Sequence, residues 1–379
     1  MNRNRTTPQW PGPPRAPVAE LLADLSAGKM VILLDAAERK NEAKLVLAAE
    51  CANASAINFM AKYGKGLICL ALSRQRCQEL GLALQGAAAE GRQPCRANGL
   101  AFTVSIEAAE GVSTGISAAD RALTIQRAVK GRPQDIVQPG HVFPLQAVEG
   151  GVWMRPGHTE AGCDLAALAG YEPAAVVCAI LRADGSVAQE KDIAAFAREH
   201  RLKVGHINDL IAHRIRHEAW VHRVATQTIC THYGEYVAHA YREACTGRLH
   251  IALVKGSWNP SEAIYARIHD SVSALDVLST KTHCSHEASL HTTLCQMQQQ
   301  SKGVVILLDC SESSQRIFES LASTQKNSLG KQAQGEMLAW QRHGVSLHIL
   351  RDCKVSKPDF SHDRLSLVKK GEKLSEVMA

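Results

Sequence analysis

The chain has 379 residues, more than a typical single domain, and an apolar fraction of 45%, which is enough to form buried cores. Its formal net charge of +6 suits anionic small molecules, and an aromatic content of 4% argues against a nucleic-acid stacking platform. Twelve scattered cysteines without a Cys-x-x-Cys pair favour a reduced, cytoplasmic protein, and no apolar run is long enough to suggest a membrane partner.

The proline-rich residues 1–17 predict a disordered arm, because proline removes a hydrogen-bond donor and fixes φ. Apolar residues at helical spacing predict a helix over 18–29. A short apolar run at 30–34 predicts a buried strand that opens into a dense polar loop at 35–44, with another strand at 45–49. A strand that delivers charged residues at its end commonly builds a site.

Between residues 54 and 200 the expected elements alternate in type. They are helices at 54–63, 74–80 and 191–200, strands at 67–72, 101–106 and 174–181, and a helix that begins at Ala118 with Ser117 as its N-cap. A Pro-Gly turn ending in a histidine is expected at 138–141 and again at 155–158. This alternation predicts a layered α/β domain over residues 18–217.

A basic helical segment near 211–223 marks the expected domain boundary. A second domain is predicted over 218–353, with strands at 224–231, 249–254, 263–268 and 304–308 and a helix at 286–300. Residues 354–379 are expected to form a charged tail. The predicted fold class is α/β (α+β layered), with two domains that are each a mixed sheet covered by helices.

The heptapeptide at 155–161 (RPGHTEA) gathers polar side chains behind a helix-breaking Pro-Gly. Arg155 offers a planar fork for phosphate oxygens, and Thr159 offers a hydroxyl and a backbone N–H. His158 can bind a metal or move a proton. On these residues alone a solvated surface loop is the favoured interpretation.

Longer motifs in a fixed order change that balance. They are residues 102–121 (FTVSIEAAEGVSTGISAADR), 139–145 (PGHVFPL) and 157–161 (GHTEA). On these motifs the first domain resembles 3,4-dihydroxy-2-butanone 4-phosphate synthase, an enzyme of riboflavin biosynthesis, over roughly residues 18–217. The resemblance implies a homodimer through this domain and a Mg²⁺-dependent conversion of ribulose 5-phosphate into the four-carbon phosphate and formate.

The resemblance also implies roles for single residues. Those that match the family are Asp35, Glu42, His141 and His158, expected to be catalytic, and Arg39, Thr114, Arg155 and Thr159, expected to bind the substrate. Together they imply a pocket that suits a sugar phosphate.

The loop at 35–44 departs from the family pattern Asp-x-x-x-Arg-Glu-Asn-Glu-Gly-Asp. The family's metal-binding glutamate falls on Lys40, a functional aspartate falls on Lys44, and a third family carboxylate falls on Ala179. Mg²⁺ requires hard oxygen ligands, and a charged lysine has no lone pair to offer. We therefore expect no metal site and no cofactor, with Mg²⁺ needed only if the ordinary synthase activity persists.

Two interpretations of Lys40 and Lys44 stay open at this point. The domain is retained for its fold, dimerisation or regulation, or the lysines take part in altered catalysis. A desolvated lysine can attack the C2 ketone of ribulose 5-phosphate, and a charged lysine can replace Mg²⁺ beside a developing enediolate.

The second domain is similar to GTP cyclohydrolase II, a zinc enzyme with three cysteine ligands. The phrases that carry this resemblance are residues 231–235 (THYGE), 250–254 (HIALV) and 266–269 (ARIH). The first ligand position falls on Val272, and the Cys-x-Cys pair falls near residues 283–286 (HCSH), where that pair is absent. The family's GTP loop is replaced at 309–315 (DCSESSQ). Without these thiolates we expect no zinc site and no GTP ring opening.

Three hypotheses follow from the residues and the resemblances. The first is a diverged member that binds ribulose 5-phosphate or a similar pentulose phosphate and carries out altered, Mg²⁺-independent chemistry. The second is a non-catalytic scaffold or regulator. The third is the ordinary synthase reaction, sustained by other carboxylates such as Glu38 or Glu42. In each case the expected partners exclude nucleic acid and membrane.

Overall fold

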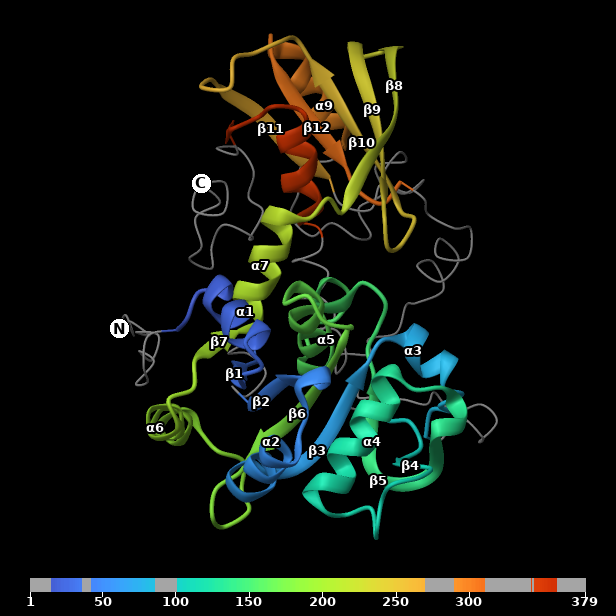
Figure 1. The fold of residues 1–379 in the computed structure, drawn as a ribbon. Coiled ribbons are helices and arrows are strands. Elements are labelled where there is room, and N and C mark those ends of the chain that lie inside the picture. Colours follow the sequence, from blue (N-terminus) through green and yellow to red (C-terminus); the bar gives the residue numbers. More distant parts are fainter. Residues whose placement is uncertain are drawn as a thin grey trace, which may run out of the picture. The chain divides into compact units, whose positions relative to one another are not determined.

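The computed structural model describes residues 15–35, 42–85, 101–269, 290–310, 342 and 344–359. The chain divides into two compact units, Met1–His213 and Arg214–Ala379, which are described separately (Figure 1). Each unit contains one mixed β-sheet with helices packed on it, which confirms the predicted fold class. In the described ranges, no helix combines the length and apolar character needed to cross a membrane.

The first unit is built on a seven-stranded sheet with the order β4-β5-β3-β6-β2-β1-β7. The strands are β1 (Val31–Leu34), β2 (Ala43–Ala48), β3 (Lys65–Leu72), β4 (Ile106–Ala108), β5 (Ile136–Gln146), β6 (Ala174–Ile180) and β7 (Val204–His206). Strand β2 is antiparallel to both β1 and β6, whereas β3 runs parallel to β5. The sheet therefore has a mixed strand pattern across its centre.

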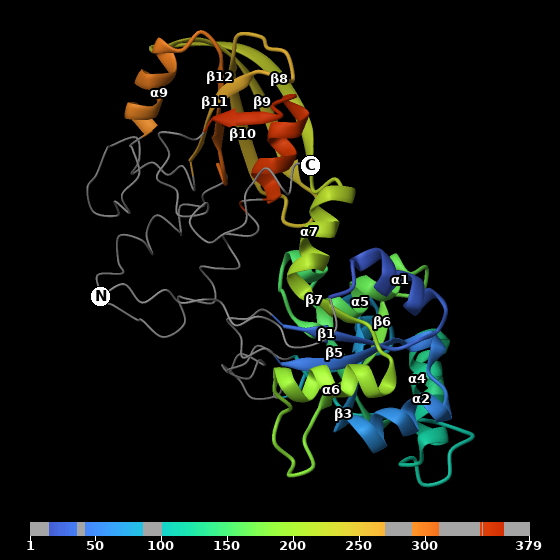
Figure 2. The same ribbon diagram turned by 90° about the vertical axis from the view of Figure 1, so that its left-hand side faces the viewer.

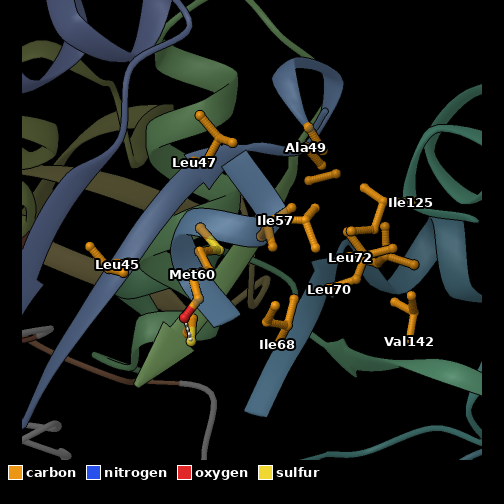
Figure 3. Close-up of a cluster of buried hydrophobic side chains, with 14 of the residues drawn as sticks. Leu45, Leu47, Ala49, Ile57, Met60, Ile68, Leu70, Leu72, Ile125 and Val142 are labelled. Carbon is orange, nitrogen blue, oxygen red and sulfur yellow. Dashed lines mark hydrogen bonds between the residues drawn. The ribbon is translucent and has the colours of Figure 1, made fainter. Parts of the chain in front are cut away.

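Helices cover both faces of this sheet. They are α1 (Val18–Ser26), α2 (Ala54–Phe59), α3 (Arg74–Glu79), α4 (Ala118–Lys130), α5 (His158–Leu168), α6 (Glu190–His200) and α7 (Ile207–His217). Leu45, Leu47, Ile57 and Ile125 belong to one buried cluster, shown in Figure 3, so α2 and α4 pack on the face that carries Leu45. Because strand side chains alternate, Lys44 faces the other side, where α5 packs.

Local sequence signals explain where several helices begin. The Ser117 side chain accepts a hydrogen bond from the backbone N–H of Asp120 at 3.0 Å, which confirms the predicted N-cap of α4. The Asn53 side chain does the same for Ala56 at the start of α2, at 2.9 Å. The helix predicted over 54–63 continues beyond Phe59 as one π-helical turn.

Several predictions of local structure were wrong. Over 101–106 only Ile106 lies in a named strand, and residues 102 and 103 make isolated bridges instead. The Pro-Gly sequence at 138–141 lies inside β5, where the pairing with β4 shifts register, rather than in a turn. A bulge of this kind accommodates proline because the ladder hydrogen bonds are already interrupted there.

Two further corrections concern residues expected to be outside regular structure. Lys44 lies in β2, because the strand begins at Ala43 and not after the polar loop. At the end of the predicted arm, the backbone N–H of Ala16 donates to the carbonyl of Val204 at 2.8 Å. The rest of the arm, residues 1–14, lies outside the described residues.

The second unit contains a six-stranded sheet with the order β13-β11-β12-β10-β9-β8. The strands are β8 (Val221–Thr231), β9 (Gly234–Glu243), β10 (Leu249–Lys255), β11 (Ala263–His269), β12 (Gly303–Leu307) and β13 (Lys357–Asp359). Helix α9 (Leu290–Gln299) packs on the sheet through Met297, beside Tyr236 and Tyr265. Strand β13 pairs with β11, so the expected tail at 354–379 contributes a strand before leaving the described range.

Candidate functional site

The start of α5 places a histidine and a threonine against the end of β1. His158 is the first residue of this helix, and its Nε2 donates a hydrogen bond to the carbonyl of Leu33 at 3.0 Å. This contact fixes the tautomer that carries a proton on Nε2. Both His158 and Thr159 are buried, and the first backbone N–H groups of a helix favour an anion. The predicted phosphate-side residues therefore lie at a helix N-terminus.

Arg155 is held beside this helix by a carboxylate to which the sequence assigned no role. Its Nη2 lies 2.7 Å from Oε1 of Glu160, which is 0% exposed. The same oxygen accepts a hydrogen bond from the backbone N–H of Val148 at 3.0 Å. Burial raises the pKa of Glu160, while the positive charge of Arg155 acts in the opposite direction. The signal was present in the motif GHTEA, because this glutamate follows Thr159 directly.

Lys44 occupies the middle of a three-strand row. It lies opposite Leu33 on β1 and opposite Ala179 on β6. It shares a face of β2 with Val46, because side chains alternate along a strand. Helix α5 packs on this face, since a Cβ added at Gly162 would lie 3.8 Å from Val46. Lys44 is half-buried on this face. Its side chain thus belongs to the same side of the sheet as the start of α5.

Asp35 and Glu42 flank the same point. Asp35 follows β1, Glu42 precedes β2, and the backbone N–H of Asp35 donates to the carbonyl of Glu42 at 2.9 Å. Asp35 is buried and Glu42 is half-buried. Four of the predicted catalytic residues thus lie around the end of β1: Asp35, Glu42, Lys44 and His158. Lys40 and Arg39 lie outside the described residues.

The sheet beneath this group is tightly fixed. A Cβ added at Gly66 on β3 would lie 2.4 Å from the carbonyl oxygen of Ala179, so only glycine allows the two backbones to approach this closely. Burial raises the pKa of Cys69 to about 12 and that of Cys178 to about 11, although the Lys44 charge opposes both shifts. These thiols are therefore neutral at physiological pH, and Lys44 brings the positive charge.

A separate cluster contains Thr114 and His141. The Nδ1 of His141 donates to Oε2 of Glu107 at 2.6 Å, and the other carboxylate oxygen accepts from the hydroxyl of Thr124 at 2.8 Å. This arrangement orients the imidazole, and in the tautomer with the proton on Nδ1 its Nε2 carries a lone pair; the His141 side chain is 44% exposed. Sequence reasoning missed Glu107, although it lies in the quoted motif at 102–121.

The loop that carries Thr114 is shaped to approach this pair. Gly115 has a φ of +85°, and a Cβ there would lie 2.0 Å from Oε2 of Glu107 and 2.6 Å from Nδ1 of His141. Its backbone N–H donates to Asp120 at 3.1 Å. A hydrogen bond from the Ser113 hydroxyl lowers the pKa of Asp120, so its carboxylate stays charged and holds the loop.

The two groups of predicted site residues are not in contact within one chain. His141 is on β5 and Lys44 is on β2, with β3 and β6 between these strands. Three strand spacings of about 4.8 Å give a separation on the order of 14 Å. Beside the second group, Ile116 and Val137 are 55% and 48% exposed.

Lys40, where the resemblance places the metal-binding glutamate, lies outside the residues that the structure describes. Within those residues no group of three or more histidine, cysteine, aspartate or glutamate side chains is arranged to hold a metal ion. Lys44, at the position of a functional aspartate of the family, lies in β2 two residues after Glu42, whose carbonyl accepts from the backbone N–H of Asp35. The zinc positions at 272 and 283–286 lie outside the described residues.

A recess elsewhere in the first unit contains none of the predicted site residues. It has a volume of about 550 Å³ and lies beside the end of α4. Two of its lysine and arginine side chains are already paired, Lys130 with Glu50 and Arg132 with Asp135. We therefore place the candidate site at the start of α5 and not in this recess.

Comparison with known proteins agrees with the two units. The family model for 3,4-dihydroxy-2-butanone 4-phosphate synthase matches residues 19–213, and the model for GTP cyclohydrolase II matches residues 222–359. A 3,4-dihydroxy-2-butanone 4-phosphate synthase of Neisseria meningitidis serogroup A is 42% identical over 90% of this chain and 91% of its own length. The chain belongs to the 3,4-dihydroxy-2-butanone 4-phosphate synthase family.

Other proteins are similar over most of this chain. The riboflavin biosynthesis protein RibBA of Aquifex aeolicus is 44% identical over 77% of this chain and 71% of its own length. The crystal structure of a two-domain 3,4-dihydroxy-2-butanone 4-phosphate synthase from A. baumannii has a TM-score of 0.72 and 39% identity, covering 95% of this chain and 97% of that chain. The two family models together support a synthase and GTP cyclohydrolase II fusion, whereas the predicted divergence of both sites stays a prediction.

Proposed function

We propose that the first unit is a lyase that converts ribulose 5-phosphate into 3,4-dihydroxy-2-butanone 4-phosphate and formate in riboflavin biosynthesis. The observation that carries this proposal is the 42% identity, over nine-tenths of both chains, to a relative that bears the name of the synthase. The grouping of Asp35, Glu42 and His158 at the start of α5 supports it. We therefore propose the ordinary synthase reaction ahead of the altered chemistry that the loop at 35–44 suggests.

The substrate phosphate binds at the start of α5. Arg155 offers its guanidinium fork there, Thr159 offers its hydroxyl, and the helix N-terminus adds backbone N–H groups. His158 is held in one tautomer at the same helix start by the carbonyl of Leu33. Asp35 and Glu42 supply the carboxylates that move protons during the carbon-skeleton rearrangement. We route no step through Mg²⁺, because Lys40 and Lys44 stand in the sequence where the family resemblance places carboxylates.

The active assembly in this proposal is a homodimer formed through the first unit. Within one chain, His141 and Thr114 lie about three strand spacings, on the order of 14 Å, from Lys44. The exposed side chains of Ile116 and Val137 flank the His141 group and provide apolar surface for a second copy. Pairing of two copies allows the His141 group of one chain to complete the α5 site of the other.

A second candidate function is supported by the register of β2 and β6. Lys44 and Ala179 face each other at the position where the family resemblance places two carboxylates. Here a charged Lys44 stabilises the enediolate in place of a metal ion, or a neutral Lys44 forms an imine with the C2 ketone. In both cases the pentulose phosphate still binds at α5, but the reaction does not depend on Mg²⁺.

The second unit acts in this proposal as a structural or partner-binding domain without GTP cyclohydrolase activity. Support comes from the sequence, because Val272 and His286 stand where thiolates are needed. If the purified protein neither binds nor converts a pentulose phosphate but stabilises an enzyme of the pathway, both units act as a scaffold or regulator.

One experiment separates these readings. The pure protein is incubated with ribulose 5-phosphate, with and without EDTA, and formate and sugar products are followed by mass spectrometry. Formate release supports the proposed function, and its abolition by EDTA identifies the ordinary Mg²⁺-dependent synthase. A product that persists in EDTA, or a borohydride-trapped adduct on Lys44, supports the second candidate. Unchanged sugar in both samples contradicts the proposed lyase activity.

A further inference from the structure

A tyrosine, a histidine and a cysteine meet in the second unit, away from the site described above. Tyr233 lies in the turn between β8 and β9, and Figure 2 shows this turn beside the first turn of α9. The Tyr233 hydroxyl lies 2.7 Å from Nδ1 of His291, and Nε2 of the same ring lies 3.8 Å from Sγ of Cys295. Both nitrogens of His291 are therefore engaged, one by a phenol and one by a thiol.

The geometry follows from the helix and from the hairpin that reaches it. His291 and Cys295 are four residues apart in α9, so they lie on one face of the helix. Tyr233 approaches that face from another part of the chain, and the Tyr236 hydroxyl donates to the Tyr233 carbonyl at 3.1 Å. His291 is exposed and Cys295 is half-buried. The thiol thus has solvent access and a defined neighbour.

The hydrogen bonds permit a proton transfer. In the tautomer with a proton on Nδ1, His291 donates to the Tyr233 oxygen, and its Nε2 lone pair can accept the proton of the Cys295 thiol. The resulting imidazolium donates from both nitrogens, to the phenol oxygen and to the thiolate. A histidine that is oriented by a third group is the usual way to activate a weak nucleophile.

We propose that Cys295 is a modification site that forms a mixed disulfide with a low-molecular-weight disulfide, with His291 as its base and Tyr233 as the positioning residue. Nε2 of His291 takes the thiol proton, and the Cys295 sulfur attacks one sulfur of the small disulfide. A new S–S bond forms as the old one breaks, and the leaving thiolate takes the proton from His291. Cys295 is oxidised and the second half of the small disulfide is reduced.

The other cysteines provide an internal comparison. Burial raises the pKa of Cys69 to about 12 and that of Cys310 to about 11, so these thiols stay protonated. Cys230 lies on β8 and is more exposed than Cys295, yet it makes no hydrogen bond with a histidine in the described part of the chain. Exposure alone would make Cys230 react faster. Activation by His291 predicts the opposite order.

The test compares modification rates at single cysteines in the full-length protein. Iodoacetamide and glutathione disulfide are the probes at pH 7, and peptide mass spectrometry reads each site. We expect Cys295 to react at least about tenfold faster than Cys230, because an ordinary thiol is only a few per cent ionised at this pH. His291→Gln should lower the Cys295 rate to that of the more exposed Cys230 or below it, and Tyr233→Phe should lower it partly.

The order of rates decides the outcome. At pH 9.5 the advantage of Cys295 should disappear and the more exposed Cys230 should react at least as fast, because a thiol then needs no neighbouring base. A Cys295 rate at pH 7 no higher than that of Cys230, or one unchanged by His291→Gln, would overturn the proposal. Circular dichroism of each variant shows that the fold is intact. Cys295→Ser should remove the mixed disulfide from the α9 peptide and leave the other sites unchanged.

Discussion

Lys44 on β2 lies directly opposite Ala179 on β6, as one registered pair of the seven-stranded sheet. The family resemblance places a carboxylate at each of these positions, so both changes act at a single point of the site. A negative pair is replaced there by one positive charge next to a small apolar side chain. This relationship makes Lys44 the residue whose removal should be most informative.

The second candidate function predicts that Lys44→Ala lowers turnover of ribulose 5-phosphate by about 10² or more, because one preorganised charge beside a developing oxyanion contributes on this scale. Steady-state formate release or product formation measures the effect. Lys65→Ala serves as the matched control, since Lys65 is exposed at the start of β3. Equal turnover in wild type and Lys44→Ala would rule out a catalytic role for this lysine.

A second prediction concerns Ala179. Ala179→Glu should place a carboxylate opposite Lys44 and lower turnover about tenfold or more, because the new ion pair neutralises the charge that the reaction needs. In the Lys44→Ala background the same substitution should have little further effect. The double-mutant cycle measures this coupling, and Ala179→Gln controls for size. Additive effects of the two substitutions would contradict direct pairing.

Glu107 is predicted to position His141. Glu107→Gln should lower turnover about tenfold or more and shift the pH profile, because the amide no longer stabilises a protonated imidazole. The pH dependence of kcat/KM is the measurement, because a purely structural role would leave its shape unchanged. Glu110→Gln is a suitable control, since Glu110 is exposed in the loop that follows β4.

The Arg155–Glu160 pair should contribute to stability as well as to binding. Glu160→Ala removes the buried partner of a mostly buried arginine, and we expect a loss of about 3 kcal/mol in the free energy of unfolding. Urea denaturation measures it, with Glu149→Ala as an exposed control. Glu160→Gln should be milder in stability but should still weaken binding of the phosphate group. A change below about 0.5 kcal/mol for Glu160→Ala, the scale of ordinary surface substitutions, would contradict this account.

The second unit should become less stable in acid because of His348. Burial lowers the pKa of His348 to about 4, and the charge of Arg351 acts in the same direction. The unfolded chain therefore binds this proton first, so stability is lost as pH falls from about 6.5 to about 4, by at most about 3 kcal/mol. Urea unfolding across this range should show a shallower pH dependence for His348→Gln than for the exposed control His232→Gln.

The fold was largely predictable from the sequence because its signals are local. Ser117 caps α4 as its residue type suggests, and the apolar runs of β1 and β10 are strands. The strand that contains Lys44 was placed too late because the charged residues at 42–44 hide its start, although pairing with β1 and β6 on both sides forms it. The position of Pro139 inside β5 depends on a bulge that no local rule shows.

The candidate site was predictable by residue type but not by arrangement. The motif at 155–161 pointed to Arg155 and His158, which both lie at the start of α5. The partners that orient site residues, Glu160 and Glu107, were missed because such roles depend on contacts across the fold. The distance between the His141 group and Lys44 follows from strand order, which the sequence alone does not specify.

The close approach of Gly66 to Ala179 has an evolutionary consequence. Because the β3 and β6 backbones are locked together at this point, side chains at positions 44 and 179 can be exchanged while the scaffold beneath them stays in place. Substitutions at these two positions can therefore reverse the charge of the site during evolution without changing the fold that the family shares. Members of one lineage can share almost every strand and still differ in which ions they attract.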